Sequence, residues 1–200
     1  MPTVAERFVA ALGKPTRNAS GMKFTSRGQQ MIWDSLGIQA GWYKGSFLYL
    51  FGDELAQFQP CLDAWSFIVP PGHADRMIIG RNAYGALLVL EDGNKPGSEH
   101  IYVLDPFLVT YTTSENLTLS SLVGRWLPLG ELSTFTDDSV YRAWVKQNEV
   151  EPELEDVLGF KVPRALGGAF DVSNVQLDGL LDYYRTTGDV YAKSFPSTTT

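Results

Sequence analysis

The stretch that decides the fold is Glu155-Asp156-Val157-Leu158-Gly159-Phe160-Lys161-Val162-Pro163-Arg164-Ala165-Leu166-Gly167-Gly168. It is apolar and rich in glycine. Pro163 lacks a backbone N–H and disfavours helical geometry at the residue before it, so a long helix is excluded. Only a short extended segment fits between Val157 and Val162. We interpret the stretch as a buried connector, with Leu166 inside, that docks the C-terminal helix region onto the body of the protein. An ordinary strand–turn–strand is the alternative.

Upstream of this stretch, hydrophobic periodicity predicts two helices followed by a sheet. The helices are expected from Pro2 to Leu12 and from Arg27 to Leu36, the second with Met31 facing inward. The aromatic segment from Gly45 to Phe51 predicts a strand. Four further strands are expected to form an antiparallel meander, over Arg76–Arg81, Gly85–Glu91, His100–Leu104 and Phe107–Thr112. The continuous apolar run from Leu87 to Leu90 predicts that its strand is central.

Capping residues predict three helices after the sheet. Their starts are expected at Thr118 or Ser120, at Asp137 or Ser139, and at Ser173. The last helix is expected over Val175–Tyr184, with Leu177 facing the core. The elements together predict an α+β fold, in which helices from the N- and C-terminal parts pack on a central antiparallel β-meander.

The expected organisation is an N-terminal part with the central sheet over residues 1–130 and a C-terminal module packed on it over residues 131–193. Residues 194–200 are expected to be a frayed tail. The composition does not shift enough along the chain to require a hard boundary, so one continuous domain is the alternative.

The composition indicates a folded protein with an acidic surface. Of the 200 residues 44% are hydrophobic and 20% are charged, which excludes a disordered chain. No apolar run is long enough to span a bilayer, and the N-terminus does not resemble a signal peptide, so a cytoplasmic location with no membrane association is expected. The net charge of −7 disfavours direct nucleic-acid binding and suits a basic partner.

The sequence offers few residues for catalysis or for binding a metal or cofactor. The two histidines, His73 and His100, lie far apart and match no ligand spacing, and Cys61 is expected to be a buried, inert thiol. No nucleophile elbow, phosphate-binding loop or dinucleotide fingerprint is present. We therefore expect a binding protein with no cofactor, rather than an enzyme.

Acidic and aromatic residues supply the candidate contact sites. Asp137 and Asp138 form one acidic group, and five acids between Glu149 and Asp156 form another, which includes Glu151 and Glu153. Three interpretations stay open for them: paired catalytic carboxylates, a solvated face, or a patch that faces a partner. Trp42 and Tyr43 lie between two glycines and are the aromatic residues expected to be exposed, where they would serve as interface anchors.

Two parts of the chain resemble a known family. The run LGFKVPRALGG from Leu158 and the run VSNVQLDGLLDYY from Val172 resemble the C-terminal module of bacterial GAD-like immunity proteins. The run MIWDSLGIQAGWYKGSFLYLFGDELAQFQPCLDAW from Met31 resembles the N-terminal part of that family, which corresponds here to residues 1–130. Val162 and Arg164 replace smaller apolar residues of the family pattern.

The resemblance implies an immunity protein of the type VI secretion DNase-immunity group. Such a protein binds a cognate secreted toxin in the cytoplasm and occludes its active site or substrate-binding surface. The contact surface is then expected at Asp137, Asp138, Glu149, Glu151 and Glu153, with Trp42 and Tyr43 as anchors. The alternative is a small cytosolic enzyme or ligand-binding domain that uses an aromatic pocket.

Overall fold

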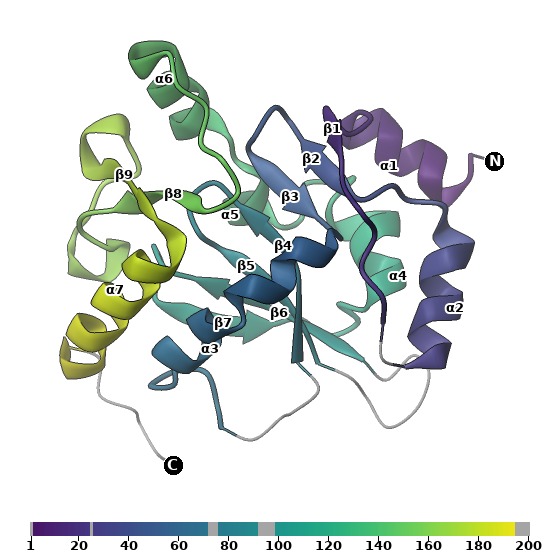
Figure 1. Cartoon of the computed structure of the whole chain (residues 1–200), viewed down its shortest axis with the longest axis horizontal. Coiled ribbons are helices and arrows are strands. Elements are labelled where there is room, and N and C mark those ends of the chain that lie inside the picture. Colours follow the sequence, from purple (N-terminus) through teal and green to yellow (C-terminus); the bar gives the residue numbers. More distant parts are fainter. Residues whose placement is uncertain (1, 25, 72–75, 92–98, 195–200) are drawn as a thin grey trace.

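A seven-stranded antiparallel sheet is the centre of the computed structural model, which describes residues 2–24, 26–71, 76–91 and 99–194. The strands follow chain order as a meander: β1 (Arg17–Asn18), β2 (Gly41–Tyr43), β3 (Leu48–Leu50), β4 (Arg76–Asn82), β5 (Leu87–Glu91), β6 (His100–Asp105) and β7 (Thr110–Thr113). The N-terminal helices lie at one end of the molecule and the C-terminal elements at the other, with the sheet between them (Figure 1). The predicted α+β fold is confirmed.

The middle of the sheet is the core. Leu87, Leu88, Val89 and Leu90 of β5 are almost completely buried, as predicted for a central strand. Strand β7 begins later than expected, because the Asp105 carboxylate accepts hydrogen bonds from two backbone N–H groups of the segment after β6 and holds it in a turn. That turn shapes the pocket described below.

The two N-terminal helices form where the sequence predicts them. Helix α1 (Val4–Leu12) begins with a capping box between Thr3 and Glu6. Helix α2 (Arg27–Leu36) buries Trp33 against Phe51, with ring centroids 4.5 Å apart. The prediction that Met31 faces inward is wrong, since Met31 is 65% exposed. Trp33 on the same helix provides the core contact instead.

Shorter helices fill the connections. They are η1 (Asp53–Phe58), α3 (Pro60–Ala64), α4 (Leu119–Ser121), the π-helical η2 (Leu122–Trp126), α5 (Ser133–Thr136) and α6 (Ser139–Asn148). Pro60 occupies the first turn of α3, where its missing N–H costs no hydrogen bond. Of the two predicted caps, Thr118 and Ser120, it is Thr118 that caps α4. No helix of the described residues is long and apolar enough to cross a membrane.

The C-terminal elements differ from the prediction. Strand β8 (Asp156–Phe160) pairs with β9 (Val175–Gly179), and two short turns, η3 (Arg164–Leu166) and η4 (Val172–Asn174), lie between them. The predicted helix over Val175–Tyr184 is wrong in its first five residues, because they pair with β8. Helix α7 (Leu180–Ser194) follows and packs on α3, while Leu177 is 43% exposed rather than in the core.

The connector prediction is correct for one half of the stretch and wrong for the other. Val157, Leu158 and Phe160 are buried, and the Leu158 N–H donates to Ala83 O at the end of β4, which docks β8 on the body. Leu166 is 54% exposed, contrary to the prediction. The Pro163 carbonyl accepts from the Leu166 and Gly168 N–H groups, so the turn satisfies its own backbone and leaves its side chains in solvent. The predicted boundary after residue 130 stays a prediction, and residues 195–200 of the predicted tail lie outside the described residues.

Candidate functional site

The acidic segment from residue 149 to residue 156, here called the acidic strap, connects α6 to β8. Glu149 adopts a left-handed conformation (φ 55°) that ends α6 and turns the chain. Glu149, Glu151, Glu153 and Glu155 are exposed, whereas Pro152 is buried. Val150 is 47% exposed among the acids. The strap therefore presents four carboxylates and one apolar side chain to solvent.

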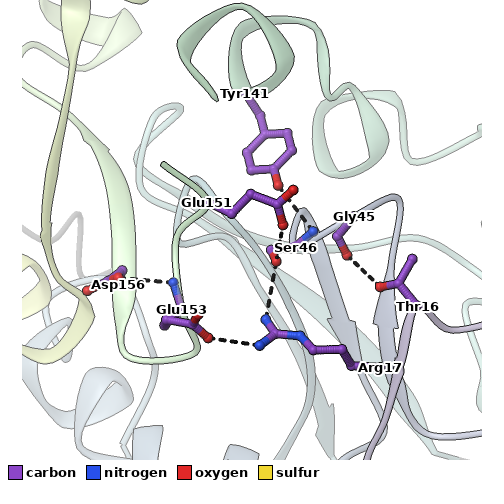
Figure 2. A network of polar contacts seen from close by, with 8 residues as sticks. All are labelled: Thr16, Arg17, Gly45, Ser46, Tyr141, Glu151, Glu153 and Asp156. Atoms are coloured by element: carbon purple, nitrogen blue, oxygen red, sulfur yellow. Dashed lines mark hydrogen bonds and ion pairs between the residues drawn. The ribbon is translucent and has the colours of Figure 1, made fainter. Parts of the chain in front are cut away.

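Polar contacts fix the strap against the turn between β2 and β3 (Figure 2). Ser46 Oγ donates to Glu151 Oε2 at 2.8 Å and accepts from Arg17 Nη2 at 3.2 Å. Arg17 Nη1 also lies 3.0 Å from Glu153 Oε2. The Ser46 N–H donates to the Tyr141 hydroxyl at 3.1 Å. Two of the predicted contact residues are thus held by neighbours from distant parts of the sequence.

A buried arginine holds the strap from beneath. Arg81 on β4 is 1% exposed, and its guanidinium donates to the carbonyl oxygens of Leu154 and Asp156 and lies over the Phe58 ring at 5.7 Å. Burial lowers the pKa of Arg81 to about 10, so the side chain is still charged at neutral pH. The sequence analysis did not identify Arg81, because the alternation of side chains along a strand does not show which distant segment packs over it.

Trp42 and Tyr43 are not exposed, so the prediction that they anchor a partner on the surface is corrected. They are 7% and 1% exposed, because β2 is an internal strand that pairs with both β1 and β3. Tyr43 packs edge-on against Phe8 at 5.4 Å, and the Arg17 guanidinium covers Trp42 at 5.1 Å. These aromatic residues support the strap's neighbours rather than contact solvent.

The second predicted acidic group lies at the other end of α6. Asp137 precedes the helix and accepts a hydrogen bond from the Ser139 N–H, and Asp138 pairs with Arg142 at 3.3 Å. The ten-residue helix separates this group from the strap by about 15 Å. The structure therefore brings Glu151 and Glu153 together but places the two acidic groups at different points of the surface.

Asp137 contributes to a pocket of about 170 Å³ between the sheet and the C-terminal elements. Its floor is a cluster of four aromatic rings, Tyr84, Phe107, Phe160 and Phe170. Phe107 and Phe160 have centroids 4.1 Å apart, and the half-buried Phe170 meets Tyr84 edge-on at 5.4 Å. Sequence reasoning missed this set, because the four residues come from three separate segments.

Polar groups line the same pocket. Asp105 is 5% exposed, and both hydrogen bonds that it accepts from described residues end on Oδ1, from the Phe107 and Leu108 N–H groups. Burial raises the pKa of this carboxyl. Arg164 and Asp137 are exposed at the margin, with the side chains of Ser133 and Thr134 beside them. The pocket thus combines aromatic surface with one buried carboxylate.

Of the residues considered for catalysis, the structure describes Cys61 and His100, which lie in different environments. Cys61 is 1% exposed, and burial raises its pKa to about 12, which keeps the thiol protonated. His100 is exposed at the start of β6, and His73 lies outside the described residues. Within the described ranges, no group of three histidine, cysteine, aspartate or glutamate side chains could hold a metal ion.

Comparison with known proteins gives a fold and no function. No protein-family profile matches the chain, and no curated protein matches its sequence. Among solved structures, the chain is similar to the crystal structure of Atu4351 from Agrobacterium tumefaciens. The TM-score is 0.58 at 12% sequence identity, with 92% of this chain and 87% of that chain covered. At this identity the two proteins share an α+β fold, and the similarity says nothing about activity or partners.

Proposed function

We propose that this chain is an immunity protein that binds a cognate secreted toxin, a DNase effector of a type VI secretion system, and blocks its active site or substrate-binding surface in the cytoplasm. The observation that carries the proposal is the acidic strap, which exposes four carboxylates on a backbone fixed by Arg81. The sequence resemblance to GAD-like immunity proteins supplies the class of partner.

Charge complementarity supports the choice of partner. A nuclease binds a polyanion, so its cleft presents lysine and arginine side chains to phosphates. Carboxylates that occupy the phosphate positions satisfy the same side chains, and complementary charge speeds encounter. Because the strap is already ordered, little conformational entropy is lost when it binds.

An apolar contact is also needed, because exposed ion pairs contribute little on their own. With Trp42 and Tyr43 buried, the exposed apolar side chains next to the strap or on the β8–β9 loop take this role. They are Val150, Val162 and Leu166. We assign the anchor to Val150, because it lies between the carboxylates of the strap.

The proposal predicts that a neighbouring reading frame encodes a nuclease domain, and the direct test is inhibition of that domain. Plasmid cleavage by the purified nuclease domain should fall to background at an equimolar amount of this chain, and coexpression should remove its toxicity. If cleavage continues with the folded chain in excess, the proposal is wrong.

The contact surface is tested by replacing Glu149, Glu151 and Glu153 with glutamine, which keeps the hydrogen-bond acceptors of the strap. Surface plasmon resonance at two ionic strengths should show slower association and a weaker salt dependence. The control replaces three exposed acids elsewhere, Asp63, Glu115 and Asp189, with their amides, so that the net charge changes equally. Equal effects of the two triple variants would mean that the strap is only a solvated face.

A second function is favoured by a specific observation. The aromatic pocket of about 170 Å³ supports the alternative, a small enzyme or ligand-binding domain that uses this pocket for a small molecule. Its volume is below the roughly 300–1,000 Å³ of typical small-molecule sites, which is why we place it second.

A further inference from the structure

The aromatic pocket has features that the acidic strap does not explain. Its volume of about 170 Å³ suits the end of one side chain better than a whole cofactor. The four-ring floor lies between elements that are distant in sequence, and the pocket opens beside Asp137, at the α6 end opposite the strap.

The aromatic floor favours a positively charged group. The face of an aromatic ring carries negative potential, and a cation within about 6 Å of the ring centroid is attracted to it. Phe170 is the half-buried ring of the set, whereas Tyr84, Phe107 and Phe160 are buried behind it. The arginine–ring contacts among the described residues lie elsewhere, so no arginine of the described part of the chain covers these four rings.

The charges around the pocket favour the same group. Asp105 is buried and lines the pocket, and the hydrogen bonds that it accepts from described residues end on Oδ1 rather than on Oδ2. Asp137 adds a second carboxylate at the margin. Arg164 opposes them, but it is exposed, so solvent screens its charge more strongly than that of Asp105. The lining therefore holds two carboxyl groups against one guanidinium, and the buried carboxyl is the least screened of the three.

We propose that this pocket binds a guanidinium group, with the ring of Phe170 against its face and Asp105 and Asp137 as acceptors. A guanidinium is planar and presents several N–H donors, which suits an aromatic surface beside carboxylate oxygens. The bearer of the group is an arginine of the bound toxin. That assignment of the bearer rests on the proposed function, whereas the preference of the pocket for a guanidinium does not.

The preference is measured with small probes on the full chain. N-acetyl-arginine N-methylamide is titrated while NMR shifts of the pocket residues are followed, and the citrulline analogue, which is neutral and of equal shape, is the control. Saturable shifts at Tyr84, Phe107 and Phe170 with the arginine probe, and weaker shifts with citrulline, are expected. Equal binding of the two probes, or no binding of the arginine probe, would overturn the proposal.

Two single substitutions with opposite expected effects on the affinity for the arginine probe sharpen the test. Asp105→Asn retains an acceptor for the turn and should weaken binding of the arginine probe by roughly tenfold, the size of one lost charge-assisted hydrogen bond. Arg164→Gln removes the opposing charge from an exposed position and should strengthen binding. Arg164→Gln remains informative even if Asp105→Asn does not fold. Weaker binding of the arginine probe to Arg164→Gln would contradict the predicted repulsion between Arg164 and the guanidinium and overturn the proposal.

The toxin experiment separates this inference from the proposed function. If the chain inhibits the nuclease and Phe170→Leu speeds dissociation of the complex, the bearer is a toxin arginine. If inhibition is intact and Phe170→Leu leaves the dissociation rate unchanged, the assignment of the guanidinium to a toxin arginine is wrong. If the chain binds the arginine probe but no nuclease, the immunity proposal fails and the guanidinium site stands.

Discussion

Two arginines connect the acidic strap to the sheet, and they differ in almost every physical respect. Arg81 is buried, and its guanidinium donates to two backbone carbonyls of the strap. Arg17 has a side chain that is 49% exposed, and it pairs with Glu153, whose side chain is 64% exposed. A buried donor that satisfies backbone groups has no water to replace it, whereas an exposed ion pair competes with solvent and salt.

The difference shows which contact determines the conformation of the strap and which one only adjusts its charge. Arg81 fixes the backbone path, because two part-buried carbonyl oxygens of the strap would lose their donor without it. Arg17 neutralises one carboxylate that would otherwise face a partner. Stability and recognition are therefore assigned to different residues of one short segment.

The largest expected effect is that of Arg81→Met. It should lower the free energy of unfolding by about 3 kcal/mol, because it leaves two part-buried carbonyls of the strap without their donor. Urea denaturation followed by tryptophan fluorescence gives this value. Arg17→Met, the same substitution at the exposed arginine, is the matched control. Similar losses for the two variants would show that burial of Arg81 does not matter.

A smaller effect is expected at Asp105, the buried carboxylate. Burial raises its pKa, so its contribution to stability is complete below the unfolded value of about 3.9 and is lost as the pH rises through the folded pKa. Asparagine does not titrate and retains an acceptor for the turn. The Tm of Asp105→Asn relative to the wild type should therefore rise between pH 4 and pH 7. A Tm difference between the variant and the wild type that stays constant with pH would contradict the raised pKa of Asp105.

The smallest effect is expected for the exposed ion pair. A double-mutant cycle of Arg17→Met and Glu153→Gln should give a coupling free energy of about 0.2–1 kcal/mol that decreases at high salt. Thermal unfolding at two salt concentrations measures it. In the toxin complex, Arg17→Met should speed association, because it frees the Glu153 carboxylate. Slower association would mean that Arg17 itself contacts the partner.

The sequence alone determined the parts of the fold that depend on local pattern. The apolar run from Leu87 to Leu90 indicated a central strand, and Thr118 was one of two residues that indicated a helix start. The acids of the strap could also be located, because charge is visible without a structure. These features follow from periodicity, capping and side-chain chemistry within a few residues.

Only the tertiary structure decided what depends on contacts between distant segments. Val175–Gly179 is a strand because β8 is available as its partner, and Trp42 is buried because β1 and β3 flank it on both sides. The hydrogen bond from Arg81 to Leu154 and the ring contact between Tyr84 and Phe160 in the aromatic pocket each join residues more than 70 positions apart. No local pattern encodes such pairings, since burial and hydrogen bonding are properties of the folded neighbourhood.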